Sequence, residues 1–153
     1  VTTAAEMFER CGVLAPASEI VVMAAAVADY RPAAPLDHKM KKKEDSFSLA
    51  LERTPDVLRE LGRVKRPGQF LCGFALETDH EEAHAVGKLK EKNLDMIVLN
   101  SLNDPGAGFQ GDTNKVTIFT AAGTKMAFPL KSKTEVARDI VKVIAQAFLK
   151  EGR

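Results

Sequence analysis

The sequence predicts an α/β protein, a Rossmann-like three-layer sandwich with helices on both faces of a mostly parallel sheet. Short apolar runs alternate with stretches of helical period along the 153 residues, which is the pattern of βαβ units. Several of these runs are continuously apolar, as strands covered on both faces require. With 45% hydrophobic residues the chain can form one substantial core, so we expect a single domain over residues 1–153.

The first predicted elements are a helix and a strand. Thr2 or Thr3 is suited to cap a helix that has Met7 on its apolar face and ends at Gly12. The apolar run at 20–25 follows as a strand. These two elements begin the α/β alternation.

A lysine-rich flap and a short helix are predicted next. Apolar and polar residues alternate at 47–52, which indicates an exposed strand reached through the basic cluster at 39–43. Thr54 is suited to cap a helix that has Pro55 at its first position and runs to about Val64. We expect the flap to close over a ligand bound nearby.

The next segment repeats the alternation. Continuous apolar runs at 70–75 and 96–99 predict two buried strands. A helix that starts at Thr78 or Asp79 lies between them, which completes a βαβ unit.

A hairpin and a helix are predicted for the last part of the chain. The runs 116–119 and 126–130 flank a glycine-containing turn and predict an antiparallel hairpin. Ser132 and Glu135 have the spacing of a capping box, so a helix should begin there. Its apolar face consists of Val136, Ile140, Val143, Ile144 and Phe148.

Charge and cysteine content exclude several classes of protein. The 22 basic and 21 acidic residues leave a net charge of +1, which argues against a general nucleic-acid or membrane-surface binder. No apolar run reaches the length of a membrane-spanning helix. Cys11 and Cys72 are too few for a disulfide framework and lack CxxC spacing, so we expect a cytoplasmic protein.

The stretch from 20 to 43 has the pattern of a nucleotide site. Ala24 and Ala25, at the end of the predicted strand, would let a ligand lie against bare backbone, and Asp29 follows them. The lysines within 39–43 can meet phosphate. The same spacing also fits a buried strand followed by a solvated loop, so spacing alone does not decide between the two.

A wider set of motifs favours the nucleotide site. In this order, the chain contains AAAVADYRPA, KMKK, RTPDVL, GFALET, KLKEKNLD followed by MIVLN, and FQGDTNKV. This series resembles the phosphopantothenate-cysteine ligase family, also called phosphopantothenoylcysteine synthetase. In bacteria that enzyme is usually the carboxyl-terminal half of a bifunctional coenzyme A biosynthesis protein. The resemblance extends from about the first predicted helix to the last.

The resemblance implies a ligase that uses CTP and magnesium. Phosphopantothenate would become an acyl-cytidylate with release of pyrophosphate, and the amino group of cysteine would then displace CMP. The enzyme's part in such chemistry is positioning and charge stabilisation. The family also implies a homodimer, for which the strand at 47–52 is a candidate contact because an edge strand exposes unpaired backbone groups.

The resemblance further implies that part of the ligase domain lies outside this chain. Family members open with a glycine-rich strand-to-helix element, and an asparagine that assists the chemistry lies in that upstream part. Neither is present here, so we expect a partial domain that need not turn over alone. FMN would be bound only by a decarboxylase domain farther upstream.

The resemblance assigns a catalytic lysine and several nucleotide contacts. Lys39 matches the family lysine that contacts the nucleotide, where a mobile cation near the α-phosphate would stabilise developing charge. Asp29 would accept hydrogen bonds from cytosine or ribose, or lie near the metal, and no residue is assigned as a metal ligand. Backbone groups of Met23, Ala24 and Ala25 would contact the base.

The next expected contacts are at a helix start. Pro55, Asp56, Val57 and Leu58 are predicted to form a first turn, where unpaired N–H groups bind anions. The Asp56 carboxylate favours the helix dipole but repels phosphate. Either magnesium mediates the contact or the side chain turns away, and a purely structural helix start is the alternative.

Three further contacts lie in the predicted βαβ unit. Phe74 stands near the end of a buried strand and matches a family nucleotide contact, although an aromatic there can also be core. Lys88 and Lys92 are four residues apart, so on a helix they would project from one face and hold a polyphosphate together. Lysines late in a helix also complement its dipole.

Other functions fit parts of the sequence. His80 and His84 have the HExxH spacing of zinc proteases, but the surrounding acidic residues indicate a surface helix. A nicotinamide-dependent oxidoreductase would need a GxGxxG turn, which the sequence lacks. A non-catalytic nucleotide-binding module remains an alternative, and binding without turnover would identify it.

Overall fold

A central sheet organises the computed structural model, which describes residues 1–36, 38–39, 46–101 and 111–150. Within these residues five strands form the sheet, in the spatial order β1 (Ile20–Met23), β4 (Phe70–Glu77), β5 (Met96–Ser101), β7 (Val116–Thr120) and β8 (Lys125–Ala127). The first three are parallel, and β7 and β8 add to β5 as an antiparallel hairpin. The predicted parallel sheet and the predicted hairpin are both confirmed.

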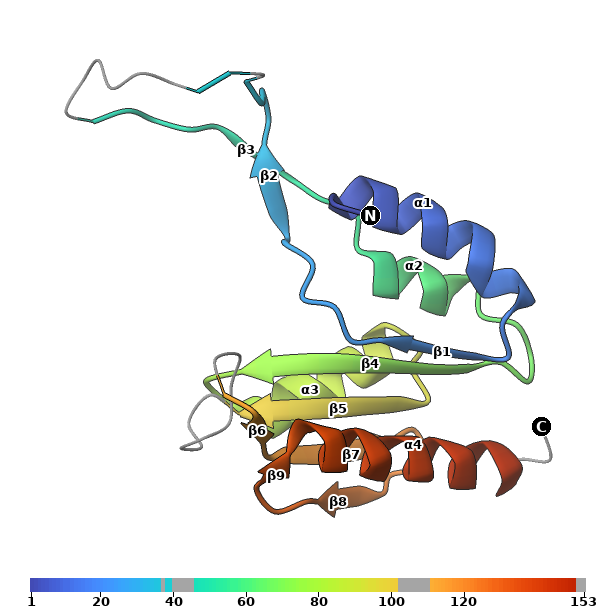
Figure 1. Cartoon of the computed structure of the whole chain (residues 1–153). Helices are drawn as coiled ribbons and strands as arrows, with labels where there is room; N and C mark the ends of the chain where they lie inside the picture. The colour runs from blue at the N-terminus through green and yellow to red at the C-terminus, as the bar shows by residue number, and fades with distance from the viewer. Residues whose placement is uncertain (37, 40–45, 102–110, 151–153) are drawn as a thin grey trace.

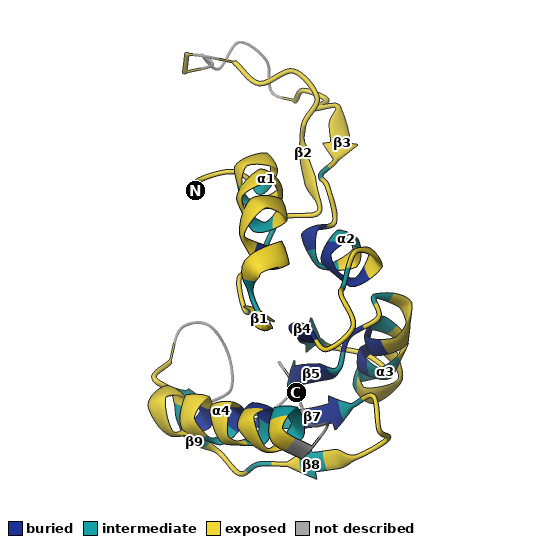
Figure 2. Cartoon of the chain, turned by 90° about the vertical axis from the view of Figure 1, so that its right-hand side faces the viewer, coloured by how far each residue is buried: buried dark blue, intermediate teal, exposed yellow. Residues whose placement is uncertain are grey.

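Helices cover both faces of this sheet (Figure 1). From one side, α2 (Val57–Arg63) and α3 (Glu81–Glu91) pack on the sheet, and Leu89 belongs to the apolar core there. From the other side, α4 (Lys133–Lys150) contributes Ile140 to a second core. Figure 2 shows α3 and α4 on opposite sides of the strands. The three-layer α/β sandwich is therefore confirmed.

The first helix, α1 (Ala4–Leu14), begins where the sequence predicts and ends later. Thr3 caps it, because the N–H of Glu6 donates to Thr3 Oγ1 at 3.1 Å and the Glu6 carboxylate accepts from the N–H of Thr3 in return. The helix continues through Gly12 and leads into a short 3-10 helix, η1 (Ala15–Ala17). The prediction that Gly12 ends the helix is wrong, because helical hydrogen bonding continues to the N–H of Ala15.

The helix α2 differs from the prediction at its start. It begins at Val57 and is capped by Asp56, whose carboxylate accepts the N–H of Arg59 at 3.0 Å. Thr54 does not cap it, because its hydroxyl donates to the carbonyl of Ala28 instead. Pro55 therefore precedes the helix, and the predicted first turn over 55–58 starts two residues too early.

The helix α3 also begins later than predicted. Its first residue is Glu81, and the preceding His80 has a left-handed backbone, with φ of 43°, and no side-chain capping bond. A residue with this φ cannot lie inside a right-handed helix, so the predicted start at Thr78 or Asp79 is wrong. At the other end Lys92 is the C-cap, one residue beyond the helix.

The chain segment between β1 and α2 forms a two-stranded hairpin that projects from the sheet. It pairs β2 (Tyr30–Pro32) with β3 (Leu51–Arg53), and an ion pair of 2.7 Å joins Arg31 to Glu52 across the strands. Figure 1 shows the described residues here, 30–36, 38–39 and 46–53, extending away from the rest of the molecule, and they are called the arm below. The predicted strand at 47–52 is shorter than expected and starts at Leu51. Part of the predicted flap, residues 40–45, lies outside the described residues.

The last part of the chain follows the prediction closely. A short pair of strands, β6 (Thr113–Asn114) with β9 (Lys131–Ser132), leads into α4. The hydroxyl of Ser132 accepts the N–H of Glu135, and the Glu135 carboxylate accepts the N–H of Ser132, so the capping box is confirmed. In the described part of the chain, the helices are too short or too polar to cross a membrane.

A close approach between α2 and α3 gives a first testable prediction. Gly62 is buried in α2, and a Cβ atom there would overlap the carbonyl oxygen of Lys92. The substitution Gly62→Ala should therefore lower the free energy of unfolding by about 3 kcal/mol, measured by urea denaturation. Gly87→Ala in α3 is the matched control, because a Cβ atom there meets open space. A loss of stability in the control equal to that at Gly62 would contradict the steric explanation.

Candidate functional site

A cavity of about 210 Å³ lies at the carboxyl ends of β1 and β4, the edge of a parallel sheet where ligands bind in open α/β folds. Its walls come from the loop after β1, the segment that leads into α2, the strand β4 and the end of α3. The lining residues are Met23, Ala25, Ala26, Val27, Ala28, Asp29, Thr54, Pro55, Asp56, Val57, Leu58, Phe74, Lys88 and Lys92. Four segments far apart in the sequence thus form one site.

Small residues and backbone form the wall next to β1. Ala25 and Ala28 line the cavity without filling it, so peptide groups are accessible to a ligand. Thr54 fastens this wall to the segment before α2. Its hydroxyl donates to the carbonyl of Ala28 at 2.5 Å, and its N–H donates to the carbonyl of Asp29 at 3.0 Å. These two bonds also form the root of the β2–β3 arm, so the arm and the cavity wall are joined directly.

Asp56 has two roles at the opposite wall. Its carboxylate caps α2 and also pairs with the ammonium of Lys92 at 2.9 Å. Burial alone would raise the pKa of Asp56, but the N–H of Arg59 and the Lys92 ammonium outweigh burial and hold the pKa below its usual value. Asp56 is therefore ionised at neutral pH. The predicted anion site at this helix start is already satisfied by a carboxylate of the chain itself.

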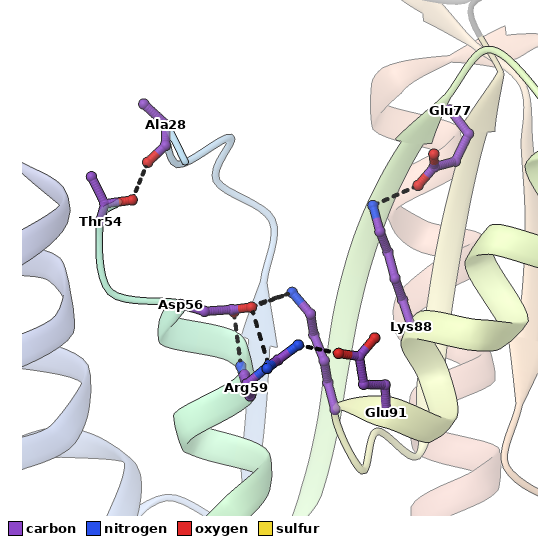
Figure 3. A network of polar contacts seen from close by, with 8 residues as sticks. Ala28, Thr54, Asp56, Arg59, Glu77, Lys88 and Glu91 are labelled. Carbon is purple, nitrogen blue, oxygen red and sulfur yellow. Dashed lines mark hydrogen bonds and ion pairs between the residues drawn. The ribbon is translucent and has the colours of Figure 1, made fainter. Parts of the chain in front are cut away.

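The second lysine of the cavity, Lys88, is also paired with a carboxylate. Lys88 Nζ lies 2.6 Å from Glu77 Oε1, at the carboxyl end of β4. Figure 3 shows Lys88 extended from α3 toward Glu77, while Asp56 lies on the side of α2. Arg59 links α2 to α3 by contacting Asp56 and Glu91. Each lysine of the cavity is thus held by a carboxylate from a different element.

This arrangement suits a ligand with several negative charges. Two ammonium groups from the end of α3 reach one cavity, and phosphate oxygens can replace the carboxylates that hold them. Asp29 adds an exposed carboxylate at the opposite wall, and Phe74 offers a half-buried aromatic surface. The cavity therefore combines two ammonium groups suited to phosphate with a carboxylate and an aromatic ring that could face the rest of a ligand.

Most of the residues assigned from the sequence lie in this cavity. The structure brings together Met23, Ala25, Asp29, Pro55, Asp56, Val57, Leu58, Phe74, Lys88 and Lys92. Ala24 and Lys39 do not line the cavity, and Lys39 is exposed in the arm. Sequence reasoning missed Thr54 as a cavity residue and Glu77 as the partner of Lys88. The motifs RTPDVL and GFALET contain both residues, but spacing does not reveal which partners they contact.

Two larger cavities lie elsewhere. One of about 480 Å³ lies between α3 and the β7–β8 hairpin, with Leu89 and Phe119 in its wall, and one of about 310 Å³ lies between the same hairpin and α4. Their walls are mostly apolar, and both cavities lie beside the β7–β8 hairpin, at the opposite edge of the sheet from β1. Size alone would favour one of these two cavities as the ligand site. Its charged groups and its position at the strand ends favour the smaller cavity instead.

The HExxH spacing does not form a metal centre in the described residues. The rings of His80 and His84 lie 6.1 Å apart at the start of α3, and the described chain contains no group of three His, Cys, Asp or Glu side chains placed to hold a metal ion. Glu82, in the middle of the motif, pairs with Lys125 at 2.5 Å. The zinc alternative therefore has no support from the geometry.

The fold and the site together define a Rossmann-like α/β domain with a ligand cavity at the ends of its parallel strands. The chain belongs to the family described as the DNA/pantothenate metabolism flavoprotein C-terminal domain, whose sequence model matches residues 1–148. The family resemblance drawn from the motifs is therefore confirmed.

Individual relatives agree with this family. The chain is 48% identical over 145 residues to the coenzyme A biosynthesis bifunctional protein CoaBC of Bacillus subtilis, covering 95% of this chain and 36% of that protein. It is also 48% identical over 144 residues to a prokaryotic protein named cysteine/cysteine sulfinic acid decarboxylase, covering 94% of this chain and 40% of that protein. A crystal structure of the C-terminal domain of CoaBC has a TM-score of 0.78 and 39% identity, and the match covers 98% of this chain and 67% of that one.

The matched regions also define how much of these relatives the chain represents. The chain spans well under half the length of the two curated relatives, and two thirds of the CoaBC C-terminal domain structure. The activity of such longer proteins therefore applies to this chain as a proposal.

Proposed function

We propose that this chain is the nucleotide-binding part of a phosphopantothenate-cysteine ligase that acts in coenzyme A biosynthesis. The main support is that four separated motifs of the ligase resemblance, AAAVADYRPA, RTPDVL, GFALET and KLKEKNLD, all contribute residues to one cavity. The family membership and the 48% identity to a coenzyme A biosynthesis protein support the same function.

The proposed reaction joins a carboxylate to an amine. The carboxylate of phosphopantothenate attacks the α-phosphorus of CTP, so that a P–O bond forms, the bond to pyrophosphate breaks, and an acyl-cytidylate results. The amine of cysteine then attacks the acyl carbon, CMP leaves with the C–O bonding pair, and the amine loses a proton as the amide forms. Positioning and charge stabilisation are sufficient for both steps.

Each part of the cavity has a proposed task. Lys88 and Lys92 bind the phosphates of CTP, and Asp29 either accepts hydrogen bonds from cytosine or ribose or lies near the metal. Backbone groups near Met23 and Ala25 contact the base. Lys39 is the proposed catalytic cation, which the arm would bring to the α-phosphate.

Magnesium fits this donor set as an ion that arrives with the nucleotide. Mg²⁺ is usually bound through one or two carboxylates together with substrate phosphates, and the cavity wall contains Asp29 and Asp56. Magnesium would neutralise phosphate charge there. In the arrangement with Asp29 near the metal, this carboxylate would hold it, while the lysines bind the remaining phosphate oxygens.

The proposed protein is a cytoplasmic homodimer. The arm exposes large apolar side chains, among them Tyr30, Phe47, Leu49 and Leu51, each more than half exposed. Apolar residues in such number on a projecting hairpin are typical of a surface covered by a second copy. FMN belongs to the proposal only as the cofactor of a separate decarboxylase domain.

A calorimetric titration with CTP and magnesium tests this function, with ATP as the comparison. We expect saturable binding of CTP that is stronger than binding of ATP. Equal binding of both nucleotides would contradict the assignment of CTP. A non-catalytic binding module predicts CTP binding but no pyrophosphate release when phosphopantothenate is added to a protein that contains the complete ligase domain.

A further inference from the structure

Glu77 is more deeply buried than the lysine it holds. The Glu77 side chain is 13% exposed and the Lys88 side chain 43%, although the two are joined by a contact of 2.6 Å. The carboxylate is fixed at the end of β4, whereas the ammonium is at the tip of a long side chain on α3. Lys88 is therefore the partner that can move when the pair separates.

The geometry places Glu77 next to the cavity and outside its wall. Lys88 lines the cavity, but Glu77 is not among the lining residues. Figure 3 shows the tip of Lys88 turned toward Glu77 and away from Asp56. Without a polyanion in the cavity, the Lys88 charge is thus directed to a carboxylate beyond the wall.

The two lysines of the cavity are held in different ways. The partner of Lys92 is Asp56, which itself lines the cavity and can face a ligand or its metal ion. The partner of Lys88 is Glu77, which does not line the cavity. A polyphosphate that recruits Lys88 must separate it from Glu77, and Glu77 then remains as a negative charge close to the ligand.

We propose that Glu77 is a positioning residue that weakens polyphosphate binding by competing for Lys88, so that the site releases pyrophosphate after it is formed. This inference rests on the proposed function. The effect depends on ligand charge, because a ligand with more negative charge gains more when Glu77 is neutral. Glu77 touches no reacting atom in this proposal and acts through Lys88.

The histidines near Glu77 do not take the place of Lys88 as its ion-pair partner. The second oxygen, Oε2, lies 3.6 Å from His84 Nδ1, which is longer than a hydrogen bond. His80 lies near Asp79 instead, at 3.6 Å. Lys88 is thus the closest cation to Glu77 in the described structure, and the competition concerns this pair.

The test is Glu77→Gln, which keeps the size of the side chain and an oxygen that can accept from Lys88. We expect the affinity for inorganic pyrophosphate and for CTP with magnesium to rise about tenfold, and the affinity for CMP to rise less. Calorimetry measures the affinities, and thermal unfolding monitors the fold. Glu82→Gln is the matched control, because its partner Lys125 belongs to β8 and neither residue lines the cavity.

A double variant shows whether Glu77 acts through the lysine. In a Lys88→Met background, Glu77→Gln should raise pyrophosphate affinity less than in the wild type. Glu77→Asp keeps the negative charge and should keep pyrophosphate affinity near the wild-type value. Equal pyrophosphate affinity in the wild type and in Glu77→Gln would overturn the inference, and weaker binding in the variant would overturn it as well.

The inference and the proposed function can fail separately. Wild-type binding of CTP together with an unchanged pyrophosphate affinity in Glu77→Gln would overturn the inference and leave the proposed function standing. Failure to bind CTP, together with a gain in pyrophosphate affinity in Glu77→Gln, would overturn the function and support the inference. Failure of both proteins to bind either ligand would overturn both.

Discussion

Replacing Lys39 with alanine should reduce acyl-cytidylate formation by about a hundredfold or more, because loss of one group that stabilises developing charge typically has this effect. Lys39 is an exposed residue of the arm, so its removal should not change the stability of the fold. The measurement is pyrophosphate release from CTP in the presence of phosphopantothenate, in a protein with the complete ligase domain. Urea denaturation checks that the variant is folded.

The position of Lys39 means that a catalytic role requires motion of the arm. The residue does not line the cavity, so the arm must bring its ammonium to the nucleotide. The arm has a stiff base, because Arg31 pairs with Glu52 and Thr54 bonds to Ala28. Motion of the arm would therefore be transmitted to the cavity wall next to Asp29.

Two comparison variants test whether the effect of Lys39→Ala depends on the positive charge and on the position of this lysine. Lys39→Arg keeps the positive charge and should retain more activity than Lys39→Ala. Lys142→Ala removes an exposed lysine from α4, on the other face of the sheet, and should have no effect. Normal turnover in Lys39→Ala would show that this lysine is not catalytic.

The layers of the fold could be predicted because they depend on local patterns. Continuous apolar runs such as 70–75 remain recognisable in any context, and in the structure β4 begins with the fully buried Phe70 and Leu71. The capping box of Ser132 and Glu135 is also a local signal, with both bonding partners three residues apart. Such features need no knowledge of the rest of the chain.

The start of α2 could not be predicted because its decisive contact is distant. Thr54 and Asp56 are both good capping residues, and the sequence offers no reason to prefer the second. In the structure the Thr54 hydroxyl donates to Ala28, 26 residues earlier in the chain, which leaves Asp56 as the cap. A tertiary hydrogen bond thus decides a local boundary.

In the candidate site, too, local features could be predicted from the sequence and contacts between separate elements could not. Spacing alone predicts that Lys88 and Lys92 project from one face of a helix, and the structure places both in the cavity. It does not predict that their partners are Glu77 on β4 and Asp56 at the start of α2, because these contacts join separate elements. The free energy that a phosphate must supply to displace Glu77 and Asp56 from the two lysines therefore cannot be predicted from the sequence.

Replacing Lys92 with methionine should weaken binding of CTP with magnesium by about a hundredfold, for two reasons that act together. The variant loses a cation that is only 18% exposed and close to the ligand position, and it leaves the Asp56 carboxylate without that partner. Calorimetry measures the affinity. Lys90→Met is the matched control, because Lys90 is in the last turn of α3, two residues before Lys92, but lines a different cavity.

The pKa of Asp56 provides an independent measure of the same change. Its folded-state pKa is depressed, so Asp56 stabilises the protein above its unfolded pKa, and this stability is lost as the pH falls through the folded value. Loss of the Lys92 ammonium removes one cause of the depression, so in Lys92→Met stability should begin to fall at a higher pH than in the wild type. An identical acid profile in the two proteins would contradict the assigned pairing.

A compensating variant separates the two causes of weakened binding in Lys92→Met. Asparagine can cap a helix as well as aspartate does, so Asp56→Asn should preserve the start of α2 while removing the negative charge. In the double variant, CTP binding should recover in part, because the phosphate no longer meets an unpaired carboxylate, but the lost cation is not replaced. Full recovery would mean that Lys92 serves only to neutralise Asp56. Absence of any recovery would mean that the unpaired Asp56 carboxylate does not weaken binding. The whole effect of Lys92→Met would then come from losing the direct contact between Lys92 and phosphate.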